Sequence, residues 1–245
     1  MDRFSNRFSQ NGGQTKFDPK VIFNFSNLDK STKSHLKNVY ACVSMEIIIA
    51  ALGAAINCYL KSTVLHFGGI IGLFVFIYLT ASSKNTATPM KRLGYVSGLA
   101  CCLGLESSYL LDYVISVDPS IIVTAFVTTS VVFVSFTLTA LYAERRSMLF
   151  LGSLLSTALS GLLILSLANM FFRVPSIALF SVYLSLIISC LFVMYDTQLI
   201  VEKKRLGDND FIWHSVDLFI DFVIIFKDLM IILTDKEKKK RRSNK

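Results

Sequence analysis

The chain has 245 residues, with 25 Lys and Arg against 17 Asp and Glu, and a mean hydropathy of +0.57. Hydrophobic residues make up 53% of it and charged residues 17%, whereas soluble domains are about 45–50% apolar and about 25% charged. No Lys or Arg occurs from Leu93 to Glu144, a stretch much longer than the roughly 20 residues that cross a bilayer. These features exclude an ordinary soluble protein and predict a polytopic membrane protein without a separate soluble domain.

Apolar segments follow one another along the chain, and each is long enough to form a membrane-spanning helix. They cover residues 37–60, 64–82, 93–115, 120–142, 148–171, 177–201 and 211–233. We expect a cytosolic polar leader over residues 1–35, a transmembrane bundle over residues 36–233 and a basic tail over residues 234–245. The predicted fold class is an all-α integral membrane protein, a bundle of seven helices.

The charges of the loops predict the orientation, because Lys and Arg are enriched in cytosolic loops. Two basic residues, Lys61 and Arg173, lie in one set of loops, whereas the loops after the second, fourth and sixth segments hold Lys84, Lys91, Arg92, Arg145, Arg146, Lys203, Lys204 and Arg205. A cytosolic N-terminus follows. The basic tail conflicts with seven full crossings, which would place it on the far side. A re-entrant last segment and a complete seventh helix are therefore both open alternatives.

The last apolar segment carries several ionisable side chains, namely His214, Asp217, Asp221, Lys227 and Asp228. A charge at the centre of a span costs about 2.5–3.5 kcal/mol on insertion scales, so these groups must face protein or water. At about 100° per residue, the three aspartates fall within roughly 40° of one another. We therefore expect this helix at the centre of the bundle, with its polar stripe lining a cavity.

A fourth aspartate, Asp196, lies about one turn inside the end of the sixth segment. Asp217 and Asp221 lie roughly 9 and 15 Å into the last segment at about 1.5 Å per residue. Carboxylates that converge in a low dielectric cannot all be ionised cheaply, so a pair shares a proton and titrates as one coupled unit. We predict that Asp196, Asp221 and Asp217 form a pH sensor or a cation site. The alternative is that each aspartate only caps or pins a helix.

Other polar residues of the apolar segments are candidates for the same cavity. Glu46 in the first segment and Glu106 in the third have no partner that the sequence places beside them. His214 is interpreted as an interfacial residue, with cavity lining as the second option. Lys227 and Asp228 are adjacent near the far boundary, and we expect them to form a structural or snorkelling pair.

The sequence lacks the residues that several enzyme classes need. It has 3 His, too few for a membrane zinc hydrolase with three protein ligands near the acidic cluster. An intramembrane aspartyl protease is the closer rival, since Asp196 and an aspartate in the next helix give two carboxylates, but its Gly-x-Gly-Asp motif is missing. Phosphate-binding and nucleophile-elbow motifs are missing too. We expect no enzyme activity, no cofactor and no nucleic-acid partner.

Several segments together carry a family resemblance. They are Lys91–Gly94, Asp118–Ile121 with Thr124–Phe126, Ser135–Leu138 with Leu141–Ser147, Tyr195–Ile200 and Asp210–Asp221. As a set they resemble the Bax inhibitor family, and most closely its Bax inhibitor-one branch of eukaryotes. The likeness runs from about Ser31 to the basic tail.

This resemblance implies a multi-pass protein of the endoplasmic-reticulum membrane that leaks calcium, with the last helix central. It assigns the pH-responsive aspartyl pair and the calcium path to Asp196 and Asp221, with Asp217 as their neighbour. It also implies suppression of apoptosis, with antiapoptotic Bcl-type proteins and an ER stress sensor as partners. A non-conducting membrane adaptor that binds such proteins is the alternative. Glu46 has no counterpart that we can assign in the family pattern.

Overall fold

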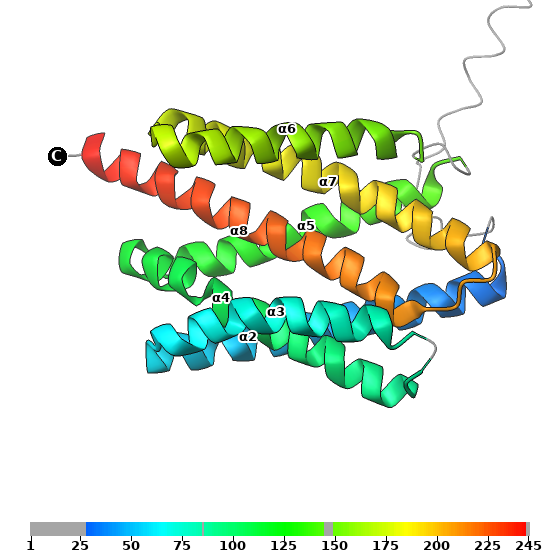
Figure 1. Cartoon of the computed structure of the whole chain (residues 1–245). Helices are drawn as coiled ribbons and strands as arrows, with labels where there is room; N and C mark the ends of the chain where they lie inside the picture. Colours follow the sequence, from blue (N-terminus) through cyan, green and yellow to red (C-terminus); the bar gives the residue numbers. More distant parts are fainter. Residues whose placement is uncertain (1–27, 85, 145–148, 244–245) are drawn as a thin grey trace, which may run out of the picture.

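The computed structural model describes residues 28–84, 86–144 and 149–243, and this part of the chain folds into α-helices without any strand (Figure 1). The helices are α2 (Lys30–Leu60), α3 (Thr63–Ser82), α4 (Pro89–Val117), α5 (Ser120–Tyr142), α6 (Leu151–Phe172), α7 (Pro175–Arg205) and α8 (Phe211–Ser243). Each predicted apolar segment forms one helix, so the all-α fold class is confirmed. Residues 1–27 of the predicted leader, and Arg145 and Arg146, lie outside the described residues.

Most of the helices are longer than their apolar segments, although α5 and α6 are not. The helix α2 begins at Lys30 rather than at residue 37, and α4 begins at Pro89 rather than at residue 93. Proline suits the first turn of a helix because its fixed φ matches the helix and its missing N–H is not needed there. The helix α7 continues to Arg205, where basic side chains interact favourably with the helix dipole. Charged residues that we expected in loops therefore form terminal turns.

The helix α8 is continuous over 33 residues, and it includes residues 234–243 of the predicted tail. At about 1.5 Å per residue it is about 50 Å long, more than the roughly 30 Å of a hydrocarbon layer. The last segment therefore has the length of a complete crossing and contains no break. The helices α2 to α7 each contain an apolar stretch long enough to cross a membrane.

Two loops that carry or adjoin basic residues lie at the same end of the bundle. The start of α2, the α3–α4 loop and the α7–α8 loop lie together at one end, here called the basic end, where Arg92 contacts Asp210 at 2.7 Å (Figure 1). The turns after α2, α4 and α6 lie at the opposite, distal end. The helix α8 ends there too, with Arg241 3.6 Å from Asp118. The α3–α4 and α7–α8 loops thus lie at one end as the positive charges predicted, whereas the basic residues of α8 lie at the other end.

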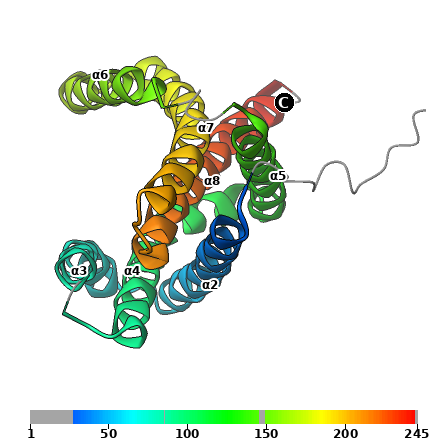
Figure 2. The same cartoon turned by 90° about the vertical axis from the view of Figure 1, so that its right-hand side faces the viewer.

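The helix α8 lies at the centre of the bundle, as predicted, and the buried side chains of Leu218, Phe219 and Ile225 belong to it. Figure 2 shows it among α2, α4, α5 and α7, on all of which it packs. We expected all six other helices to surround it, but α3 packs mainly on α4 and α6 mainly on α7. These two helices are strongly apolar, and lipid can cover their free faces. In α6, Leu155 is the one buried residue.

Candidate functional site

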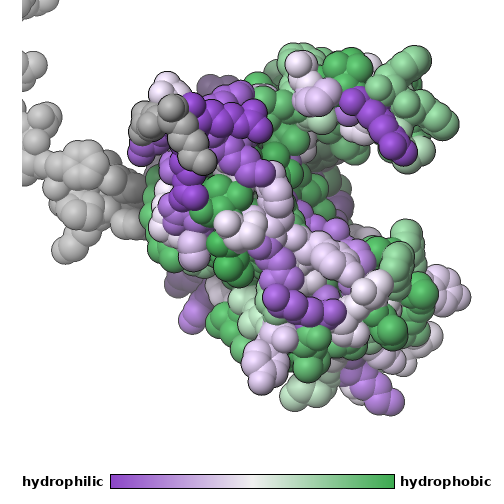
Figure 3. Space-filling view, turned by 90° about the vertical axis from the view of Figure 1, so that its left-hand side faces the viewer, coloured by the Kyte–Doolittle hydropathy of each residue, from purple (hydrophilic) through white to green (hydrophobic). Residues whose placement is uncertain are grey.

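The predicted aspartates lie together in a cavity between α6, α7 and α8. The cavity has a volume of about 420 Å³. Apolar side chains such as Leu159 and Leu162 of α6 form its outer wall. Figure 3 shows the surface hollowed on the side where α6 and α3 stand apart. The polar residues that line the cavity are Ser185, Ser189, Asp196, Lys203, Asp217 and Asp221.

Asp196 of α7 and Asp221 of α8 both line this cavity and are close enough to interact electrostatically. Asp217, one turn before Asp221, is close enough to interact electrostatically with both. Asp221 is 6% exposed, and its Oδ2 atom has no hydrogen-bond partner among the described residues. Two carboxylates can hydrogen-bond only if one of them carries a proton, because ionised oxygens are acceptors alone. Carboxyl groups this close in a low dielectric cannot all be ionised cheaply, so the arrangement suits a pair that shares one proton.

A cationic side chain lies in the wall of the same cavity. Lys203 follows Asp196 by seven residues on α7 and is near both Asp196 and Asp217. Trp213, the single tryptophan of the chain, also lines the cavity. Because Lys203 lies in the last turns of α7, its ammonium group stands between the basic end and the aspartates. A cation that enters from this end meets Lys203 first.

Lys227 does not pair with its neighbour Asp228 as we expected. Its Nζ atom contacts the Oε2 atom of Glu106 on α4, and both side chains are partly exposed. Glu106 is therefore joined to α8 by an ion pair and is not among the residues that line the aspartate cavity. Asp228 is buried, with an Oδ2 atom that lacks a hydrogen-bond partner in the described part of the chain.

Glu46 also lies outside the cavity, in the packed interface between α2 and α8. It is fully buried, and its Oε1 atom accepts a hydrogen bond of 2.6 Å from the Ser215 hydroxyl. The Cys42 thiol donates to the same oxygen at 3.5 Å, while Oε2 has no partner among the residues described. A hydroxyl and a thiol, rather than a cation, thus reach this side chain.

Substitution of Glu46 will show whether its charge or its shape matters. An ionised carboxylate buried without a cation is costly. We therefore expect Glu46→Gln, which keeps the shape and is neutral, to lower the free energy of unfolding by about 1 kcal/mol, because its amide N–H groups lack an acceptor. Glu46→Ala leaves a void and is expected to cost about 2 kcal/mol. Thermal unfolding in detergent measures both. Equal losses for the two variants would contradict a neutral side chain.

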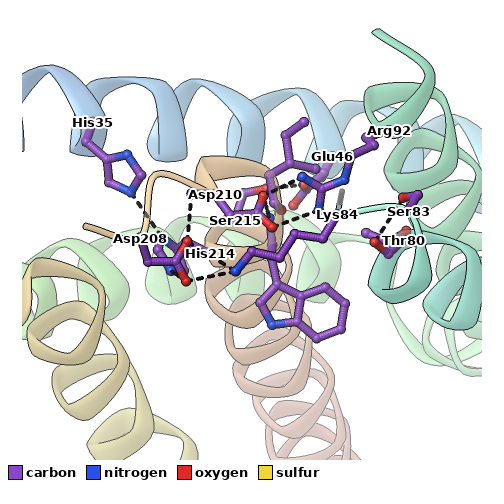
Figure 4. Close-up of polar contacts among 12 residues, drawn as sticks. His35, Glu46, Thr80, Ser83, Lys84, Arg92, Asp208, Asp210, His214 and Ser215 are labelled. Carbon is purple, nitrogen blue, oxygen red and sulfur yellow. Dashed lines mark hydrogen bonds and ion pairs between the residues drawn. The ribbon is translucent and has the colours of Figure 1, made fainter. Parts of the chain in front are cut away.

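His214 is buried beneath the α7–α8 loop, at 1% exposure, and not interfacial as expected. Its Nδ1 atom lies 3.0 Å from Nε2 of His35, and its Nε2 atom lies 3.9 Å from the Asp208 carboxylate (Figure 4). The early start of α2 explains the difference, because it places His35 over His214. His214 does not line the aspartate cavity.

Arg92 and Asp210 form a buried ion pair that the sequence analysis missed. Two hydrogen bonds join them, from Nη1 to Oδ1 at 2.7 Å and from Nη2 to Oδ2 at 2.8 Å, and the side chains are 8% and 5% exposed (Figure 4). Asp210 also accepts a bond from the backbone N–H of Trp213 and so caps α8. An aspartate directly before an apolar helix was the available signal.

The pKa of Asp210 is lowered by the groups that surround its carboxylate. Burial acts to raise the pKa, but the hydrogen bonds from Arg92 and from the Trp213 amide, with the charges of Arg92 and Lys84, hold it below the ordinary value of 3.8. Asp208, which lies in the same loop as Asp210, forms an ion pair of 3.0 Å with Lys84 of the α3–α4 loop. The α7–α8 loop is thus fixed to α4 and to the α3–α4 loop in ionised form.

In the described part of the chain, no group of three or more His, Cys, Asp and Glu side chains is arranged to hold a metal ion. The fold and the site together define a multi-pass, all-helical membrane protein with a carboxyl pair between two of its helices.

Comparison with known sequences gives the family. Residues 32–238 match the family model described as Inhibitor of apoptosis-promoting Bax1. The chain is 47% identical over 229 residues to Probable Bax inhibitor 1 of Paralichthys olivaceus, an alignment that covers 90% of the chain and 94% of that protein. It is 44% identical over 241 residues to Bax inhibitor 1 of Homo sapiens, with 94% and 99% covered. The chain belongs to the Bax inhibitor family, which confirms the predicted resemblance.

Proposed function

We propose that this protein is a calcium leak of the endoplasmic-reticulum membrane that responds to pH through Asp196 and Asp221, and that it inhibits apoptosis. The contact between these two carboxyl groups inside the cavity carries the first part. Membership of a family described as an inhibitor of apoptosis-promoting Bax1 supports the second part. A cytosolic N-terminus is proposed from the distribution of Lys and Arg in the loops. Antiapoptotic Bcl-type proteins and an ER stress sensor are proposed as partners from the family resemblance.

The chemistry of the cavity suits a passing divalent cation. Calcium prefers oxygen ligands, and carboxylates supply them. Like charges in a low-dielectric cleft concentrate counter-ions, while weak binding at several groups allows an ion to leave again. Asp217 and Asp221 on α8 and Asp196 on α7 provide such groups in one cavity.

Protonation of the pair links the cavity to pH. The shared proton joins α7 to α8 through Asp196 and Asp221. Loss of the proton leaves two like charges in contact, which repel, whereas a second proton removes the charge that attracts cations. Calcium flux should therefore vary with pH as the pair gains or loses a proton.

Calcium flux through the purified protein in sealed liposomes tests this proposal. The liposomes contain a calcium indicator, and influx is recorded over the acid to neutral range against liposomes without protein. Flux above that background, with a pH profile, supports the leak. No flux at any pH would refute it and leave the adaptor, in which the carboxyl pair only holds α7 to α8.

A second readout does not need flux. Terbium ions take oxygen ligands as calcium does, and their luminescence is excited by a nearby tryptophan. Trp213 is the single tryptophan and lines the aspartate cavity. Sensitised terbium luminescence that calcium displaces would show a cation beside Trp213, whereas its absence would speak against cation entry.

Removal of the Lys203 charge is expected to increase calcium flux severalfold, because its ammonium group competes with entering cations for Asp196 and Asp217. The variants are Lys203→Gln, and Lys203→Arg, which keeps the charge and is expected to match the unsubstituted protein. Lys204→Gln is the control, since Lys204 bonds to Asn209 and does not line the cavity. Equal flux for Lys203→Gln and Lys204→Gln would contradict this role.

A further inference from the structure

A groove separates α2 from α5 on the side of the bundle away from the aspartate cavity. Its volume is about 590 Å³, within the range of about 300–1,000 Å³ that small-ligand pockets occupy. Residues of α2 between Lys33 and Ile47 form one wall, and residues of α5 between Ser130 and Leu141 form the other. Phe222 of α8 contributes to the lining between them. The helices α2 and α5 each pack on α8 (Figure 2).

The groove has the composition and the length of a lipid site. Its lining is largely apolar, with side chains such as Leu36, Val43 and Phe133, and both walls belong to helices able to cross a membrane. Ten residues separate Lys37 from Ile47, a rise of about 15 Å. This is half of the roughly 30 Å hydrocarbon layer. The groove therefore extends over one leaflet, from the basic end to the middle of the membrane.

Positive charge is confined to one end of the groove. Lys33 and Lys37 are one turn apart on α2, both are exposed, and both belong to the lining at the basic end. The nearby acid, Asp29, accepts a hydrogen bond from the Thr32 hydroxyl and is not part of the lining. Basic residues above an apolar pocket between spanning helices are suited to an anionic lipid headgroup.

We propose that this groove binds one anionic phospholipid of the leaflet at the basic end. Its phosphate contacts Lys33 and Lys37, and one acyl chain lies along Phe133 toward Phe222. The site is separate from the aspartate cavity, and nothing in it depends on ion flux.

Native mass spectrometry of the full-length protein, titrated with dioleoylphosphatidylserine or dioleoylphosphatidylcholine, tests the proposal. We expect one phosphatidylserine to be retained more tightly than phosphatidylcholine. Each lysine near a membrane surface contributes roughly fivefold in affinity for an anionic lipid, so Lys33→Gln/Lys37→Gln should weaken phosphatidylserine binding roughly 25-fold. Phosphatidylcholine, whose headgroup has no net charge, should lose much less. Lys30→Gln/Lys91→Gln is the matched control, because it removes two exposed lysines at the same end that lie outside the groove.

A second pair of variants tests the acyl-chain part. Val134 lines the groove, whereas Val131 is exposed on the same helix outside it. We expect Val134→Trp to reduce phosphatidylserine retention and Val131→Trp to leave it intact. Equal retention of the two lipids, equal losses in both lysine pairs, or no difference between the tryptophan variants would overturn the proposal. Equally tight binding of glycerophosphoserine, which has no acyl chains, would also overturn it, as would a protein that retains no lipid.

Discussion

Replacement of Asp221 by Asn is expected to abolish the pH dependence that the shared proton gives to calcium flux, and to reduce the flux roughly tenfold. The Asn amide is a permanent donor, so Asp196 receives its hydrogen bond without a proton that can be lost. The cavity also loses one of the two carboxyl groups that can be ionised beside a cation. Asp196→Asn should give the same result, because either change removes the carboxyl pair. Flux into liposomes at several pH values measures both effects.

Asp228→Asn is the matched control for these variants. Asp228 is buried on the same helix, seven residues beyond Asp221, and is not part of the cavity lining. We expect it to keep the flux and its pH profile. Asp221→Asn with an unchanged profile would contradict a gate at this pair. Such a variant that still protected cells from apoptosis would favour the membrane adaptor.

Replacement of Arg92 by Met is expected to destabilise the protein by about 3–5 kcal/mol, because it leaves Asp210 buried without its counter-charge. The α7–α8 loop and the cap of α8 depend on this pair. The chain has five free cysteines, of which Cys42 and Cys102 are buried, so a thiol-reactive dye reports unfolding. The apparent midpoint of thermal unfolding should fall by roughly 10 °C.

Two further variants make this result specific. Lys84→Met breaks the exposed pair with Asp208, whose side chains are 49% and 31% exposed, and should cost less than about 1 kcal/mol. Arg92→Met/Asp210→Leu removes both charges and should recover part of the loss, less the cap that Asp210 provides to α8. If Arg92→Met were no more harmful than Lys84→Met, the buried pair would not anchor the loop.

Acid should act on this pair only at low pH. The pKa of Asp210 is lower than 3.8 in the folded protein, so its ion pair contributes stability above 3.8 and loses it as the pH falls through the lowered value. The contribution of this pair to the stability of the unsubstituted protein should therefore be constant from neutral pH to about pH 5. A change of flux in this range has to come from other groups.

Much of the fold could be predicted from hydropathy and charge alone. The apolar segments located every helix of the described chain, and the excess of Lys and Arg grouped the loops correctly at the basic end. The spacing of Asp217 and Asp221 placed them on one face of a central helix, which the structure confirms. The side of the membrane on which each end lies stays a prediction.

Partners far apart in the sequence could not be predicted. Arg92 and Asp210 are 118 residues apart, and hydropathy treats both as solvated loop charges. Glu106 and Lys227 lie on helices whose rotation depends on packing against all their neighbours. For the same reason the sequence did not show that Ser215 faces Glu46. The sequence shows how many acidic residues lie in the spanning helices, but it does not show which neighbouring helix each of them faces.

The two ends of α8 are held by contacts of unequal burial. At Phe211 the helix is fixed through the buried pair of Arg92 and Asp210. Towards its other end its polar contacts with neighbouring helices are partly or fully exposed, namely Lys227 with Glu106, Lys238 with Tyr113 and Arg241 with Asp118. A rigid helix held in this way tilts about its fixed end, and the displacement of each residue increases with its distance from that end. Asp221 lies roughly 15 Å from it and the last turn roughly 45 Å, at about 1.5 Å per residue. A force on the basic residues of the last turn thus acts on the Asp196–Asp221 contact with about a threefold mechanical advantage.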